Sequence, residues 1–157
     1  MAHLLSNWQL NGIYRYATGT PFTATTDATA CNCPGNGNFA DAVAPVQILE
    51  GIGPGQPWFS ISSFAVPGPN RFGNAGRNTI RGPHLSNYDF SLFRTFAIKE
   101  RVRLEFRGEF YNLTNTPQFS NPSGNGVNVS SGSFGVITST LTGYGNRQIQ
   151  TALRVTF

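Results

Sequence analysis

The chain has 157 residues, of which 39% are hydrophobic and only 11% are charged. Soluble domains carry about 25% charged residues, so this composition is unusual for a globular protein surrounded by water. The ten Arg and one Lys are spread along the chain, and this dispersed pattern excludes a basic patch for nucleic acid. No apolar run approaches the roughly 18 residues of a membrane helix, so any membrane crossing must use strands.

The residue types favour an all-β chain with many turns. Gly and Phe are abundant, with 18 and 13 copies, and Lys99 is the single lysine. Such a chain is poor in helix formers and rich in residues of strands and turns. The length fits one domain. The N-terminal residues MAHLLSNWQL lack the basic and long apolar regions of a secretory signal, so we expect a fragment or the tail of a longer exported protein.

The first predicted strand covers residues 6–17, where apolar and polar positions alternate except at Ile13. Successive side chains of a strand point to opposite faces, so this segment has one apolar face. A tight turn at 18–21 is expected to lead into a second strand at about 22–27. The apolar face of the first strand carries Trp8, Leu10, Gly12, Tyr14 and Tyr16.

Residues 28–85 form a long predicted loop, rich in Gly, Pro, Asn and Ser, with short strands expected only near 46–49 and 59–64. A connection of this length is implausible inside a compact soluble domain but normal as an external loop of a large barrel. Cys31 and Cys33 lie in this loop. A disulfide between them would be strained and two thiols are too few for a zinc site, and their redox state stays open.

Two more strands follow at about 87–98 and 101–113, separated only by Lys99 and Glu100. The first carries Arg94 as an exception on its apolar face. The second alternates strictly, with an apolar face opposite a charged one. Its apolar face contains Val102, Leu104, Phe106, Gly108 and Phe110, and its polar face contains Arg101, Arg103, Glu105, Arg107, Glu109 and Tyr111.

A second long loop, at 114–146, has one short strand expected near 133–140. The chain then closes with an alternating strand at 147–157 that ends on the aromatic Phe157. Strands of about 9–11 residues cross a bilayer when tilted, and apolar-out, charged-in alternation at this length is typical of an outer-membrane β-barrel. The alternative is a soluble sandwich or barrel, whose strands also alternate.

The connections between the five predicted strands run short, long, short, long. Outer-membrane barrels have short periplasmic turns and long extracellular loops. Counting back from a periplasmic C-terminus, the turn at 98–100 is periplasmic and the loops at 28–85 and 114–146 face outside. The sequence therefore predicts an antiparallel part of a transmembrane barrel.

The sequence offers few groups of residues that would suit catalysis or metal binding. His84, Ser86 and Asp89 are close in sequence, but a triad needs convergence in space, so we predict no catalytic residues. Glu105 and Glu109 lie about 13–14 Å apart along a strand, too far for a glycosidase pair. His3, His84 and the two cysteines match no metal-site spacing. No cofactor is predicted.

The polar face of 101–113 is the better candidate for binding. We expect Arg103, Glu105, Arg107 and Glu109 to line a lumen and to pair with neighbouring strands, a plug or a ligand. Trp58, expected to be exposed in the long loop, is a further candidate ligand contact. The other aromatics fit a lipid-facing or interfacial girdle; these are Trp8, Tyr14, Tyr16, Tyr88 and Phe157.

Five segments carry multi-residue motifs: GIGPGQPWF (51–59), FGNAGRNTIRGP (72–83), NYDFSLFRTF (87–96), RVRLEFRGEFYNLTNTPQF (101–119) and the C-terminal FGVIT…RQIQTALRVTF. Together they resemble the C-terminal end of TonB-dependent receptors, especially the large Oar-like receptors with an N-terminal carboxypeptidase-regulatory-like domain. The resemblance covers nearly the whole chain after residue 6. It implies a plugged outer-membrane barrel of about 22 strands, energised through TonB, that takes up siderophores, glycans or peptides.

Two hypotheses of function follow. In the first, the chain is the C-terminal barrel segment of such a receptor in the bacterial outer membrane, not transport-competent alone, with an assembly signal at Leu153, Val155 and Phe157. Its partners would be outer-membrane lipid, the barrel-assembly machinery, the remaining barrel and plug, and indirectly TonB. In the second, it is an independent soluble β-protein from environmental DNA with a binding or hydrolytic activity. Isolated in water, the barrel segment is expected to self-associate.

Overall fold

The computed structural model describes residues 6–27 and 38–157. His3, Cys31 and Cys33 lie outside the described residues. The chain separates into two compact units. We call residues 6–17, 85–118 and 142–157 the sheet unit, and residues 18–27, 38–84 and 119–141 the loop unit.

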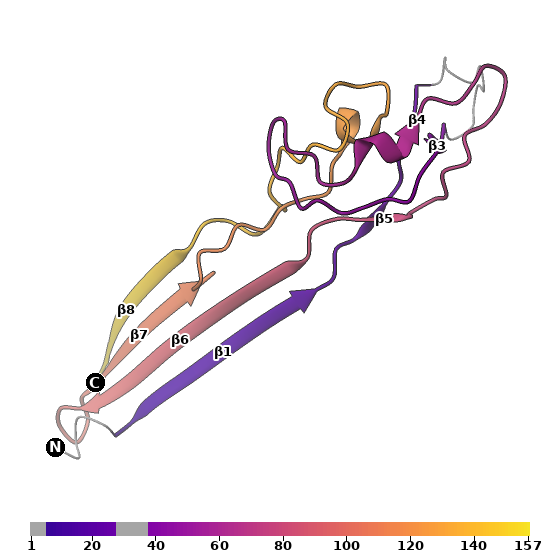
Figure 1. Cartoon of the computed structure of the whole chain (residues 1–157). Coiled ribbons are helices and arrows are strands. Elements are labelled where there is room, and N and C mark those ends of the chain that lie inside the picture. The colour runs from indigo at the N-terminus through magenta and orange to yellow at the C-terminus, as the bar shows by residue number, and fades with distance from the viewer. Residues whose placement is uncertain (1–5, 28–37) are drawn as a thin grey trace. The chain divides into compact units, whose positions relative to one another are not determined.

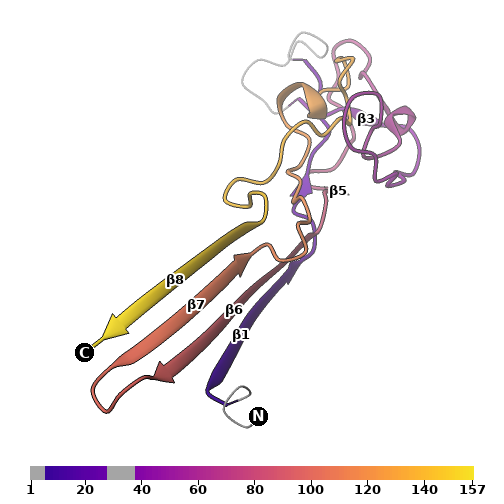
Figure 2. The same ribbon diagram turned by 90° about the vertical axis from the view of Figure 1, so that its left-hand side faces the viewer.

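The sheet unit contains four long strands, which Figure 2 shows side by side in the order β1-β6-β7-β8. Every neighbouring pair is antiparallel. The strands have 10, 13, 9 and 9 residues, close to the 9–11 or so that a tilted strand needs to cross a bilayer. The all-β class and four of the five predicted strands are thus confirmed. Their bounds are β1 Trp8–Ala17, β6 Leu85–Ala97, β7 Arg103–Tyr111 and β8 Gln148–Thr156 (Figure 1).

The register places the apolar sides of the four strands on one face. Directly opposed residues share a face of a sheet, and Leu10 is opposite Leu92, which is opposite Gly108. The polar positions of all four strands consequently fall together on the other face. The apolar face carries Trp8, Leu10, Gly12, Tyr14 and Tyr16 from β1; Tyr88, Phe90, Leu92, Arg94 and Phe96 from β6; Leu104, Phe106, Gly108 and Phe110 from β7; and Ile149, Thr151, Leu153 and Val155 from β8.

The prediction of a wall strand at 22–27 is wrong. Only β2 (Pro21–Phe22) is strand there, and it pairs with β5 (Ile80–Arg81) in the loop unit. β1 pairs with β6 instead, so residues 18–84 form one connection and not a turn, a strand and a loop. The segment alternates, but alternation does not specify a partner, and its partner lies almost 60 residues away.

The corrected connections run long, short, long. Residues 18–84 and 112–147 leave and re-enter the sheet at one end, because Ala17 is opposite Leu85 and Tyr111 is opposite Gln148. The short turn at 98–102 lies at the other end. β1 therefore runs in the opposite direction to the one predicted.

The two long connections fold together into the loop unit around a core of their own. Phe59 is fully buried there and lies 5.2–5.9 Å, between ring centroids, from the rings of Phe22, Phe64 and Phe134. All the buried hydrophobic residues of the described chain belong to this unit. The short elements of the loop unit are β3 (Asp41–Ala42), paired with β4 (Phe64–Ala65), and the 3₁₀ turns η1 (Ile61–Ser63) and η2 (Gly124–Val127).

The short strands expected at 46–49, 59–64 and 133–140 are reduced to isolated bridges and to the start of β4. Ile48 bridges to Phe59, and Phe119 bridges to Thr140. Backbone hydrogen bonds nevertheless tie the second connection to the first, with N···O distances of 2.8 Å from Val129 to Thr25 and 2.8 Å from Trp58 to Gly135. The loop unit is thus one body made from both connections.

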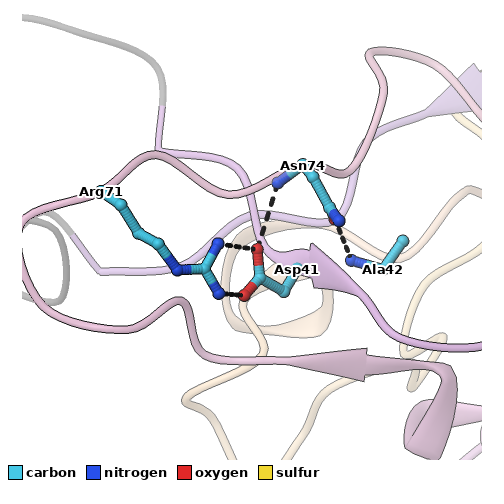
Figure 3. Close-up of polar contacts among 4 residues, drawn as sticks. All are labelled: Asp41, Ala42, Arg71 and Asn74. Carbon is cyan, nitrogen blue, oxygen red and sulfur yellow. Dashed lines mark hydrogen bonds and ion pairs between the residues drawn. The ribbon is translucent and has the colours of Figure 1, made fainter.

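The buried carboxylate of Asp41 accepts hydrogen bonds from the segment that contains Arg71 and Asn74 (Figure 3). Asp41 is 5% exposed and accepts two hydrogen bonds from the guanidinium of Arg71, one of them 3.0 Å long. The backbone N–H of Asn74 also donates to Asp41, and the Asn74 side-chain oxygen accepts from the N–H of Ala42. Gly73, between Arg71 and Asn74 in the sequence, lies so close to the backbone of Phe39 that a Cβ on it would sit 2.0 Å from the Phe39 carbonyl oxygen.

Candidate functional site

The apolar face of the sheet is not packed into the protein core. Leu10, Leu153 and Val155 are 61%, 69% and 56% exposed. Exposed apolar surface costs about 25 cal/mol per Å² in water, and a contiguous face of this kind marks a surface made for an apolar partner. The outward face of a barrel, with lipid as the partner, fits this face.

Large aromatic side chains cover the two glycines of this face. A Cβ at Gly12 would lie 2.8 Å from the hydroxyl of Tyr88, whose ring therefore lies over the glycine. Gly108 is buried between Phe106 and Phe110. The aromatic rings fill the gaps that glycine leaves in a sheet face.

Aromatic residues also mark both ends of the apolar face. Trp8 and Phe96 lie toward the turn at 98–102, and Tyr14, Tyr16 and Tyr88 lie toward the long connections. Trp8 and Tyr16 are eight residues apart, about 27 Å along a strand. The apolar band of an outer-membrane barrel is about 25 Å tall and is flanked by aromatic girdles, so the spacing fits a bilayer.

Arg94 is the one cation on the apolar face within the described strands. Its guanidinium carbon lies 4.9 Å from the centroid of the Trp8 ring and 4.3 Å from that of Phe96, and the residue is 8% exposed. Aromatic faces attract a cation through their quadrupole. The two rings therefore shield this charge at the turn end of the sheet.

The four charged residues predicted to line a lumen all lie on the polar face of β7. Arg107 pairs with Glu109 of the same strand, with 3.7 Å between Nε and Oε1, and its guanidinium carbon is 4.6 Å from the Phe93 ring centroid. Glu105 is directly opposite Arg154 of β8 in the register. The charged surface is thus formed by side chains two residues apart on β7 and by side chains that lie opposite one another on β7 and β8.

Two adjoining hollows form a trough on the polar face near the long connections. The first, about 240 Å³, lies over β1, β6 and β7, and the second, about 310 Å³, extends to residues 143–148. Three residues, Arg15, Asp89 and Tyr111, line both hollows. The remaining polar lining comes from Asn11, Ser91 and Glu109 in the first hollow and from Asn87, Asn112, Tyr144, Asn146 and Gln148 in the second.

Buried asparagines hold Asp89 in the floor of this trough. Its Oδ1 accepts hydrogen bonds of 2.9 Å from the Asn87 side chain and 2.9 Å from the backbone N–H of Asn112. Asn87 and Asn112 are 5% and 6% exposed. Asn112 has a φ of 51°, and its amide donates to the carbonyls of Thr116 and Gly145. The two hydrogen bonds to Oδ1 fix the orientation of the Asp89 carboxylate.

The turn at 112–118 joins three strands at this end of the sheet. Gln118, 3% exposed, pairs its side-chain amide with the backbone of Ser86, accepting from its N–H (2.9 Å) and donating to its carbonyl (2.7 Å). Asn115 accepts from the N–H of Arg147, just before β8. The asparagine-rich motif NLTNTPQ is therefore a clamp on β6, β7 and β8.

The prediction that Trp58 is exposed is wrong. The residue is 7% exposed, and its indole Nε1 donates to the carbonyl of Arg81 at 2.8 Å. Sequence reasoning missed Arg15 and Tyr144, and it considered Asp89 only as part of a triad. That triad does not assemble, because Ser86 and Asp89 lie on opposite faces of β6. The alternation of β6 was the available signal that Asp89 faces the polar side.

No helix in the described parts of the chain is long and apolar enough to cross a membrane. Within residues 6–27 and 38–157, no three His, Cys, Asp or Glu side chains come together as metal ligands could.

Comparison with known proteins agrees with the two-faced sheet. A family model described as an outer membrane beta barrel domain matches residues 1–150, nearly the whole chain. No curated protein and no solved structure matches the chain. With one sheet face made for an apolar partner, the other polar, and this match over almost its full length, the chain belongs to the outer membrane beta barrel domain family.

Proposed function

We propose that this chain is the C-terminal part of the barrel wall of a TonB-dependent receptor, a transporter that takes up siderophores, glycans or peptides across the outer membrane. The observation that carries the proposal is the sheet itself. It has crossing-length strands with an exposed apolar face and a charged opposite face. The motifs shared with these receptors supply the finer assignment.

The edges of the sheet require further strands. β1 and β8 each have a single neighbour in the described sheet. An unpaired edge in a bilayer leaves backbone N–H and C=O groups without partners, at several kcal/mol each, so barrels close completely. The whole wall would have about 22 strands, so its other strands and the plug would come from the rest of the receptor. The segment would not transport alone.

The connections support one orientation. The long connections that form the loop unit would lie outside the cell and the turn at 98–102 in the periplasm. β8 then ends at the periplasmic side, where Phe157, 96% exposed, is accessible to the barrel-assembly machinery. Leu153 and Val155 face the same side of β8 and complete this assembly signal.

The orientation is tested by inserting a short epitope at either of two places in the full-length receptor. One site is the exposed turn at Pro54–Gly55, and the other is the exposed residue Glu100. We expect antibody to label intact cells only for the first insertion. Labelling of the Glu100 epitope alone would overturn the orientation.

The receptor assignment is tested separately by reading the gene upstream of Met1. We expect the same reading frame to encode a plug domain and further alternating strands. A frame with barrel strands and no plug would keep the outer-membrane barrel and reject the TonB-dependent receptor. A detergent-free, sharply monomeric full chain with fixed near-UV aromatic signals would favour the soluble β-protein instead.

A further inference from the structure

We propose that the trough around Asp89 is a binding site for a neutral saccharide. The inference rests on the proposed function, because it needs the polar face of the sheet to line a barrel lumen. It narrows the substrate classes of that function to one, from the side chains of this chain.

The lining of the trough has the chemistry that sugars require. Vicinal hydroxyl groups both donate and accept, and planar side chains that offer two polar atoms match them in pairs. Carboxylates accept, guanidinium groups donate, and amides do both. The trough provides the carboxylates of Asp89 and Glu109 and the guanidinium of Arg15. It adds the amides of Asn11, Asn146 and Gln148, whereas the amides of Asn87 and Asn112 are buried and hydrogen-bonded within the protein.

Two tyrosines complete the set. Tyr111 lines both hollows and Tyr144 lines the second. An aromatic face packs against the C–H groups on one side of a pyranose ring, while the phenol can still form a hydrogen bond. The Tyr111 hydroxyl already donates to Glu109 at 3.3 Å, which places an aromatic surface and a carboxylate side by side.

The charge balance disfavours the other ligand classes. The trough is lined by two carboxylates and one guanidinium, and Arg107 pairs with one of those carboxylates, Glu109, at 3.7 Å, so the local charges balance. A site without an excess of either charge suits a neutral ligand better than a phosphate or a charged iron chelate. A peptide would need apolar pockets for its side chains. Among the residues that line the trough, only Ile13 and Phe90 have wholly apolar side chains, so such pockets are lacking there.

The preorganisation of Asp89 distinguishes the trough from an ordinary polar surface. Two hydrogen bonds from buried groups hold Oδ1, so the carboxylate loses little freedom when a ligand binds. Glu105 was predicted together with Glu109 to contact a ligand, but it lines neither hollow, although it lies on the same face of β7. This difference supplies a matched control.

The test is saturation-transfer NMR on the full chain in lauryldimethylamine oxide micelles, a detergent without sugar groups. The probes are maltohexaose and cellohexaose, with tetra-alanine as the peptide comparison. We expect transfer to at least one hexasaccharide and none to tetra-alanine. Asp89→Asn keeps an acceptor for the Asn112 N–H and removes the charge. It should weaken binding at least about tenfold, the scale of a lost hydrogen bond to a charged group.

Tyr144→Ala should also weaken binding, and it carries the test if Asp89→Asn loses its β-sheet circular dichroism. Glu105→Gln should leave binding unchanged. Equal loss with Glu105→Gln, binding of tetra-alanine instead, or no transfer to either saccharide would overturn the proposal. None of these results affects the epitope or plug tests, so failure of the saccharide site and failure of the receptor assignment are distinguishable.

Discussion

The surroundings of Trp58 and Asp89 in the structure differ from those that the sequence predicted. The sequence context of Trp58, between glycines and prolines, predicts a loop, and a loop tryptophan is expected at the surface. In the structure its ring is part of the loop-unit core and its Nε1 has a carbonyl partner. From the sequence, Asp89 is considered only as a member of a triad, whereas in the structure it lines the polar trough and is held by a hydrogen bond from Asn112. In both cases the deciding contacts join residues more than 20 positions apart.

Trp58 gives the first prediction. Trp58→Ala removes a buried ring and should destabilise the loop unit by about 3–5 kcal/mol. Trp58→Phe keeps most of the packing and leaves the Arg81 carbonyl without its donor, which should cost about 1–3 kcal/mol. Urea unfolding in detergent, followed by near-UV circular dichroism, measures both. Trp8→Phe, at a 40% exposed residue of the sheet, is the control and should change this transition little.

At the scale of elements, alternation predicted four wall strands and their faces because a strand exposes that information locally, one residue at a time. The partner of 22–27 was not predictable, because pairing with Ile80–Arg81 depends on packing between distant segments. The loop-unit core was hidden for the same reason. Phe22, Phe59 and Phe134 converge from short or irregular segments in which the sequence shows no period. The polar face of β7 followed from alternation, but the left-handed Asn112 that orients Asp89 did not.

The face assignment predicts an asymmetry between matched charge substitutions. Phe90→Arg or Phe110→Arg places a second charge on the apolar face, level with Gly12 and so midway between Trp8 and Tyr16, where a cation at the bilayer midplane costs about 2–4 kcal/mol. Either should reduce the amount of the parent receptor recovered in the outer-membrane fraction. Gln148→Arg, on the polar face of β8, adds the same side chain and should be tolerated. Equal loss for both kinds of variant would show that the faces are assigned incorrectly.

The clamp at the end of β7 makes a prediction of its own. Gln118→Ala leaves the N–H and carbonyl of Ser86 without the partners that Gln118 supplies, and this should cost about 2–3 kcal/mol. The Ser86 amide should exchange with deuterium much faster in the variant. Gln118→Glu retains the acceptor but buries a carboxylate against the carbonyls of Ser86 and Thr116, so it should not restore the stability that the alanine variant loses. Unchanged exchange at Ser86 in the alanine variant would contradict the clamp.

At the scale of the whole molecule, the two units have opposite requirements. The loop unit has a buried apolar core of its own, as a protein in water does. The sheet unit has its apolar residues on an exposed face and two open edges. One chain therefore combines a part built for water with a part built for lipid, which is the arrangement expected of a barrel wall with folded outer connections.

The unity of the loop unit can be tested by removing one connection. Replacing residues 119–141 with a short Gly-Ser linker removes Phe134 and Ile137 from the core and the hydrogen bonds to Thr25 and Trp58. Residues 38–84 should then lose their fixed structure, seen as rapid tryptic cleavage at Arg71 and Arg77. Removing only residues 54–55, at the exposed turn, should leave these sites protected. Continued protection after loss of 119–141 would show that the first connection folds alone.

The sheet unit determines how the isolated chain behaves in water. Its exposed apolar face and its two unpaired edges are both templates for association. The loop unit uses its buried apolar residues for its own core, so we expect the full chain to form β-rich oligomers in buffer. Lauryldimethylamine oxide above its micelle concentration should disperse them, as light scattering would show. Leu10→Thr together with Leu153→Thr should reduce association, because both side chains lie on the apolar face. A monodisperse monomer without detergent would mean that this face has a partner within the chain, and the lipid-facing assignment would fail with it.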